Sequence, residues 1–341
     1  MKNKKIIYII AIIILFIILI ICSCVGAANI SFFDAIKIIF KRIPFSNVDS
    51  SSIPVSSDTI IWQIRFPRVL VGALVGGALS VSGATYQGLL KNPMADPYVI
   101  GVSSGAALGA SIGIVSKISF NLLGLSFTSI MAFICAIGVV LTVYNIAKVG
   151  KKVPMTTLLL SGIAIGQFLT AITSLVMIFS ENDMQRIMLW TMGSLSGKGW
   201  EQFNTVAIYI IIGAFIIYYY AKDLNLFLLG EDTANNLGVD VERTKGILLI
   251  VSAIITALAV SVSGIIGFVG LIVPHIIRII LGPNHKTLIP MSFIAGAILM
   301  VICDTIARSL MPQEIPVGII TAIFGGPFFI YLLRKNKKEY V

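Results

Sequence analysis

The chain has 341 residues, of which 57% are hydrophobic and only 12% charged, and this composition excludes a soluble globular domain, which carries about 25% charged residues. The formal net charge of +10 does not indicate nucleic-acid binding, because the basic residues form short clusters between apolar runs and not one patch. Such clusters are typical of the cytoplasmic loop ends of membrane proteins.

The first predicted element is an apolar run at residues 6–28, which follows the basic residues Lys2, Lys4 and Lys5. A signal peptide is the alternative, and the segment around Cys22 even resembles a weak lipoprotein cleavage site. The apolar run has about 20 residues, however, and the core of a typical signal peptide has about 7–15. We therefore interpret the run as an uncleaved first membrane helix.

Nine further apolar runs follow, and their length without strict alternation favours membrane helices over a barrel. The ten predicted spans cover residues 6–28, 66–90, 97–115, 124–147, 154–179, 203–221, 246–266, 267–281, 289–307 and 317–333. An even number places both termini on one side, and the basic clusters at both ends identify that side as the cytoplasm. The predicted fold class is an all-α integral membrane protein with about ten transmembrane helices.

Two polar stretches connect these spans. Residues 44–60 are rich in Ser, Pro and Asp and are predicted to form an external loop. Residues 222–245 form the longest polar stretch on the cytoplasmic side, which we interpret as an interaction surface. Threading the chain through the membrane also places Arg65, Arg68 and Arg308 outside, where the positive-inside rule does not expect them.

Small residues recur at helical spacing in two of the spans. Gly72, Gly76 and Ser80 share one face of the second span, and the third span repeats glycine every four residues, at Gly101, Gly105, Gly109 and Gly113. Such stripes let helix backbones approach closely where lipid gives no hydrophobic drive to pack. Packing within one subunit is the leading interpretation, and a homodimer seam or a moving interface is the alternative.

The sequence also contains an internal repeat. The tetrapeptide Ser-Val-Ser-Gly at residues 80–83 recurs at residues 261–264, and the same offset relates Pro93 to Pro274 and Gly101 to Gly282. Five predicted spans separate the two copies, so they run in opposite directions, as in transporters built from inverted repeats. The repeat therefore favours a transporter but does not identify its energy source.

No phosphate-binding loop is recognisable in the chain. The nearest candidate, residues 193–199 (Gly-Ser-Leu-Ser-Gly-Lys-Gly), has the wrong spacing and lacks the Ser or Thr that would hold magnesium. If ATP drives this protein, a partner must supply the ATPase.

Ionisable residues within the spans are scarce, which weakens the alternative of an ion-coupled secondary carrier, since such carriers keep carboxylates at mid-membrane. Asp96 lies in a Pro-Met-Ala-Asp-Pro turn, and Asp304 lies one turn before Arg308. A helix cap or an Asp–Arg pair is the predicted role of these carboxylates. No His-Glu-x-x-His helix is present, so an intramembrane protease is disfavoured, and no metal site is predicted.

From residue 65 onward the chain contains a series of motifs in a defined order. They are Arg65-Phe-Pro-Arg68-Val-Leu, residues 82–88 (Ser-Gly-Ala-Thr-Tyr-Gln-Gly), 91–97 (Lys-Asn-Pro-Met-Ala-Asp-Pro), 101–106 (Gly-Val-Ser-Ser-Gly-Ala), 158–162 (Leu-Leu-Leu-Ser-Gly), 190–194 (Trp-Thr-Met-Gly-Ser), 267–275 (Gly-Phe-Val-Gly-Leu-Ile-Val-Pro-His) and 314–318 (Glu-Ile-Pro-Val-Gly). Together they make the chain resemble the FecCD permease family, the membrane subunits of ABC importers for ferric siderophores, haem and cobalamin.

The resemblance implies a cobalamin-importer-like (type II ABC importer) permease fold of ten helices in the bacterial cytoplasmic membrane. It implies a permease homodimer in lipid, two ATPase subunits that bind ATP and magnesium, and an extracytoplasmic substrate-binding protein. On this basis the chain itself is not an enzyme and holds no cofactor. A ferric siderophore is the predicted substrate, with haem or cobalamin as alternatives. A secondary carrier, or a structural or receptor membrane subunit, remains the alternative of a different class.

The resemblance also assigns roles to particular residues. Arg65, Arg68 and Arg308 match outward-facing arginines that pair with acidic residues of the binding protein in this family. The alternative is that they only anchor the helix ends at the lipid headgroups. The segment 230–239 matches the helices that couple to the ATPase, and its candidate residues are Glu231, Asp232, Ala234, Asn235, Leu237 and Gly238. Thr156 and Thr157, at the start of the fifth span, are the candidate residues of a cytoplasmic gate.

Overall fold

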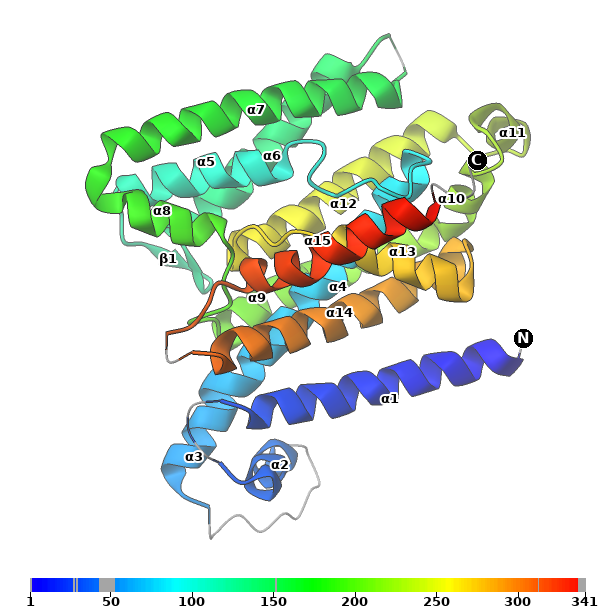
Figure 1. Cartoon of the computed structure of the whole chain (residues 1–341). Helices are drawn as coiled ribbons and strands as arrows, with labels where there is room; N and C mark the ends of the chain where they lie inside the picture. Colours follow the sequence, from blue (N-terminus) through cyan, green and yellow to red (C-terminus); the bar gives the residue numbers. More distant parts are fainter. Residues whose placement is uncertain are drawn as a thin grey trace.

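The computed structural model describes residues 2–26, 28, 30–42, 53–150, 152–311 and 313–336, and most of them are helical (Figure 1). Within these residues, seven helices are long and apolar enough to cross a membrane: α1 (Lys2–Cys24), α4 (Phe66–Leu89) with the turns before it, α6 (Phe127–Ala147), α7 (Met155–Phe179), α9 (Trp200–Tyr219), α12 (Val241–Ser263) and α14 (His285–Ser309). Three apolar helices are shorter: α5 (Val102–Val115), α13 (Val269–Leu281) and α15 (Val317–Asn336). These ten helices lie at the ten predicted spans, so the all-α membrane fold is confirmed.

The helix that contains α4 begins earlier than predicted. Helix α3 (Val55–Thr59) follows Pro54 and continues through the π-helical turn η1 (Ile60–Arg65) into α4, which gives one helix of 35 residues. The predicted external loop at residues 44–60 therefore ends in a helix, and residues 43–52 lie outside the described part of the chain. At about 1.5 Å per residue, this helix of 35 residues is longer than the ~30 Å hydrocarbon core requires.

Helix α4 lies at the centre of the bundle, against α12, α13 and α14. Glycine backbones make the closest approaches: a Cβ on Gly83 would lie 1.7 Å from the carbonyl oxygen of Gly270 in α13, and one on Gly76 would lie 2.2 Å from that of Gly296 in α14. Within membranes such small residues allow helices to meet at backbone contact. The small residues of the second span therefore pack within one subunit.

The glycine stripe of the third span lies against α6. A Cβ added at Gly105, Gly109 or Gly113 would meet the backbone of α6 at 2.3–3.0 Å, while Gly101 has a positive φ of 85° next to Val139 of α6. The stripe therefore brings α5 into backbone contact with α6.

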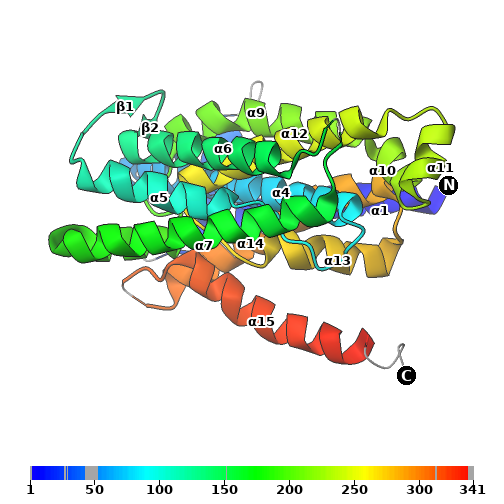
Figure 2. The ribbon, with the colours of Figure 1, turned by 90° about the horizontal axis from the view of Figure 1, so that it is seen from above.

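The start of α1 and the end of α15 lie at the same end of the bundle, together with α10 (Ala221–Phe227) and α11 (Glu231–Asn236), and we call this the termini end (Figures 1 and 2). The opposite end carries α2 (Phe32–Lys41), α8 (Met184–Thr191) and the hairpin of β1 (Asn121–Leu122) and β2 (Leu125–Ser126), and we call it the hairpin end. Helices α4 and α12, which carry the two copies of the repeat, run in opposite directions and contact each other. The stretch 222–245 is largely helical, since it contains α11 and parts of α10 and α12.

Candidate functional site

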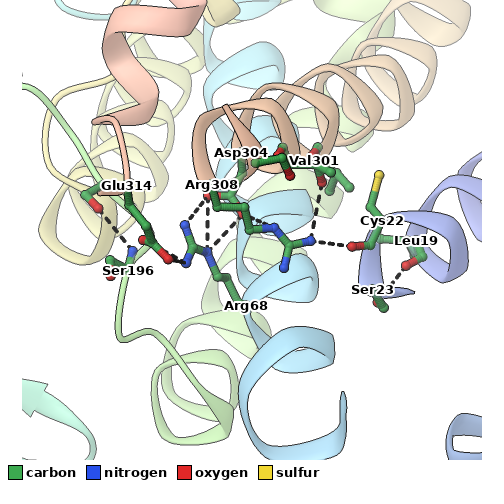
Figure 3. A network of polar contacts seen from close by, with 12 residues as sticks. Leu19, Cys22, Ser23, Arg68, Ser196, Val301, Asp304, Arg308 and Glu314 are labelled. Atoms are coloured by element: carbon green, nitrogen blue, oxygen red, sulfur yellow. Dashed lines mark hydrogen bonds and ion pairs between the residues drawn. The ribbon is translucent and has the colours of Figure 1, made fainter. Parts of the chain in front are cut away.

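A polar network at the hairpin end is centred on Arg68, in the first turn of α4 (Figure 3). Its Nη2 donates to Asp304 of α14 at 2.8 Å, and its Nε lies 3.0 Å from the other oxygen of the same carboxylate. Its Nη1 donates to Glu314, in the loop between α14 and α15, at 2.8 Å. One guanidinium therefore joins three segments, and it donates three hydrogen bonds to Asp304 and two to Glu314.

The other two arginines of the predicted docking set hold the C-terminal end of α1. Arg308 donates to the carbonyl oxygen of Cys22, and Arg65 donates to the carbonyl oxygens of Cys24 and Ala28, each at 2.8 Å. The predicted Asp304–Arg308 pair is present at 3.9 Å, but Asp304 has a closer partner in Arg68. These cations satisfy carbonyl groups at a helix end that has no further turn to bond them.

All three predicted docking arginines are buried, with exposed fractions of 5–9%. A binding protein could pair with them only by displacing the internal partners just described, so docking through these side chains stays a prediction. The most exposed group of the network is Glu314, whose side chain is 40% exposed. Partial burial raises its pKa, but hydrogen bonds and charge from Arg68 outweigh this effect and keep the pKa below its ordinary value. Glu314 begins the motif at residues 314–318, but nothing in the local sequence pairs its carboxylate with Arg68, which lies 246 residues away.

The turn between α4 and α5 holds the other carboxylate singled out in the sequence. Asp96 accepts a hydrogen bond from the backbone N–H of Tyr98 at 2.8 Å, as expected of a turn-capping side chain. Burial raises the pKa of Asp96 to about 6, although this hydrogen bond opposes the shift.

At the termini end, α11 presents an exposed surface. Leu237 is 60% exposed, and the predicted coupling residues Asp232, Asn235 and Gly238 are exposed as well. Ala234, in contrast, is fully buried, and Glu231 pairs with Lys245 of α12 at 2.6 Å. The predicted set thus divides into residues that are free to contact another protein and two residues that hold α11 in place.

The predicted gate residues lie in the first turn of α7, where Thr156 is exposed and Thr157 half-buried. Further along the helix, at spacings that keep them on the same face, Gln167, Thr170 and Ser174 are exposed. Polar side chains in a membrane span ordinarily face a bundle interior or a water-filled cavity. This face of α7 is therefore suited to line an aqueous pathway or a subunit interface.

A model of the FecCD transport family matches residues 12–335, which is nearly the whole chain. The chain belongs to the FecCD transport family. This permease is 44% identical over 285 residues to the cobalamin import system permease protein of Halobacterium salinarum, covering 84% of this chain and 76% of that protein. It is 40% identical over 283 residues to the hemin transport system permease protein of Yersinia pestis, and this alignment covers 82% of this chain and 84% of that protein.

A third relative matches over more of the chain. The Fe(3+)-citrate import system permease protein YfmD of Bacillus subtilis is 36% identical over 316 residues, covering 92% of this permease and 90% of that protein. Among solved structures, an inward-facing conformation of a metal-chelate type ABC transporter superimposes with a TM-score of 0.82 at 30% identity. The superposition covers 96% of this permease and 99% of that chain, so the two folds agree along their whole length.

Proposed function

We propose that this permease is the membrane subunit of an ABC importer that moves an iron–siderophore complex across the bacterial cytoplasmic membrane. The family match over residues 12–335 carries the proposal. The alignment with an Fe(3+)-citrate permease over 92% of the chain supports iron as the cargo metal. The importer comprises a permease homodimer, two ATPase subunits that bind ATP and magnesium, and an extracytoplasmic binding protein.

The two ends of the bundle have different proposed roles. The exposed face of α11, around Leu237, docks into the ATPase from the cytoplasm, which places both termini on the cytoplasmic side. The arginines at the hairpin end, Arg65, Arg68 and Arg308, pair with acidic residues of the binding protein after exchanging internal partners. The polar face of α7, beginning at Thr156 and Thr157, lines the pathway between the two copies.

Cobalamin is the second candidate cargo, because the permease from Halobacterium salinarum is 44% identical and is a cobalamin import protein. Haem is a third, supported by the 40% identity to a hemin permease. In this family substrate selection is expected to rest largely on the binding protein, so these candidates must be separated by measurement.

The test is uptake into liposomes that contain the permease with its ATPase and binding protein. We expect uptake of a radiolabelled ferric siderophore that requires ATP and is lost with an ATPase variant unable to hydrolyse it. Preferential uptake of labelled cobalamin or haem would identify that compound as the substrate and leave the assignment as an ABC importer unchanged. Uptake driven by an ion gradient without ATP would instead establish a secondary carrier and refute the proposal.

A further inference from the structure

A buried lysine links α11 to α12 at the termini end. The side chain of Lys245, in α12, is only 5% exposed. Its ammonium group lies 2.6 Å from the carboxylate of Glu231, the first residue of α11, and 3.3 Å from that of Glu242, one turn earlier on α12. A buried ammonium that loses its partners is costly, so the lysine is expected to hold both carboxylates as α11 moves.

The carboxylate of Glu242 extends this link to α7. One of its oxygens accepts from Lys245, and the other accepts from the backbone N–H of Val153 at 3.1 Å. Val153 precedes Pro154, which has no N–H, so this is the last backbone donor before α7 begins at Met155. The negative charge also lies near the positive end of the dipole of α7, where it is favoured.

The segments joined by these bonds are themselves firmly held. Val153 is 4% exposed and belongs to the same hydrophobic cluster as Ala234 of α11 and Val241 of α12. On the other side of Val153, a two-bond backbone bridge between Val149 and Lys152 closes the turn from α6. The N–H that Glu242 binds therefore belongs to a buried residue that directly precedes the first turn of α7.

We propose that Lys245 is a positioning residue that transmits movement of α11, through Glu242, to the start of α7 and thereby to Thr156 and Thr157. The inference rests on the proposed function, in which α11 contacts the ATPase and the first turn of α7 forms the gate. The connection from Glu231 to Lys245, Glu242 and the N–H of Val153 is continuous. It provides the physical path by which ATP binding on the partner changes the pathway in this chain.

The experiment compares Lys245→Met, which keeps an unbranched chain close to the length of the lysine stem and removes the charge, with wild type in the reconstituted complex. The control is Lys222→Met, because Lys222 is exposed at the same end of the bundle. The measured quantity is the amount of substrate moved per ATP hydrolysed. We expect Lys245→Met to assemble with the ATPase and to hydrolyse ATP, while this ratio falls about five-fold or more. The control should retain the wild-type ratio.

Further variants separate transmission from simple structural support. Lys245→Arg keeps both ion pairs and should restore the ratio, and Glu242→Ala, which breaks the link to Val153, should lower it as Lys245→Met does. An unchanged ratio in an assembled Lys245→Met complex overturns the proposal. Loss of assembly in both Lys245→Met and Glu242→Ala also overturns it, since the network would then only hold the fold. Absence of uptake by wild type would refute the proposed function instead.

Discussion

Helices α4 and α7 have similar apolar character but opposite environments. Both helices are long and apolar enough to cross a membrane, yet nearly every residue of α4 is buried in the bundle, whereas most of α7 is exposed or only half-buried. Hydropathy therefore identifies both as membrane spans but does not predict which one forms the core. The difference lies in side-chain size, because glycine and serine in α4 admit neighbouring backbones, whereas α7 exposes large groups such as Phe168 and Leu175.

The largest effect should come from breaking the ion pairs at the start of α4. Arg68→Met leaves the carboxylate of Asp304, which is 2% exposed, without its closest partner. We expect this change to lower the free energy of unfolding by about 3–5 kcal/mol, since an unpaired buried charge is costly. The measurement is unfolding of the purified permease in mixed detergent micelles, followed by tryptophan fluorescence.

The matched control is Arg186→Met in α8, directly after α7. Arg186 is 67% exposed and pairs with Asp183 at 3.1 Å, so its loss should cost less than about 1 kcal/mol. Equal losses for the two arginines would contradict the assignment of Arg68 to a buried structural network.

Leucine truncation compares the two helices directly. Leu79 of α4 is 1% exposed and Leu160 of α7 is 63% exposed. Leu79→Ala should lower the free energy of unfolding by about 2–5 kcal/mol, because it leaves a cavity at the centre of the bundle. Leu160→Ala should change it by less than about 0.5 kcal/mol in detergent. If Leu160→Ala instead weakens recovery of a permease dimer on size-exclusion chromatography, a second copy covers this face of α7.

The smallest of the three effects concerns a single methyl group. Gly83→Ala in α4 drives a Cβ against the backbone of α13, and overpacking of this kind costs about 1–3 kcal/mol. Gly166→Ala in α7 meets only the hydroxyl of Ser104, at an ordinary distance of 3.5 Å. Alanine there should leave stability unchanged or raise it by up to about 1 kcal/mol, because it restricts the unfolded chain. Thermal unfolding of both variants tests this, and a stable Gly83→Ala protein would show that α4 and α13 separate easily.

The sequence by itself determined the apolar helices of the bundle and the family. Apolar runs of sufficient length specify spans one at a time, and the ordered motifs from residue 65 to residue 318 identify the family without knowledge of helix packing. The turn that contains Asp96 was also predicted from local sequence, although its carboxylate caps the N–H of Tyr98 within that turn and not the start of α5, whose N-cap is Gly101.

Only the tertiary structure decided which helix is central and which charges meet. Arg68 pairs with Asp304 across 236 residues of sequence, and Lys245 pairs with Glu231 across 14 residues. The prediction that Arg65, Arg68 and Arg308 dock a binding protein rests on the family motif and on their position at the outer ends of spans. Neither reveals the carboxylates and carbonyl groups that pair with these arginines in the folded chain. Hydropathy and motif spacing are properties of neighbouring residues, whereas the partner of a buried charge depends on how distant helices pack.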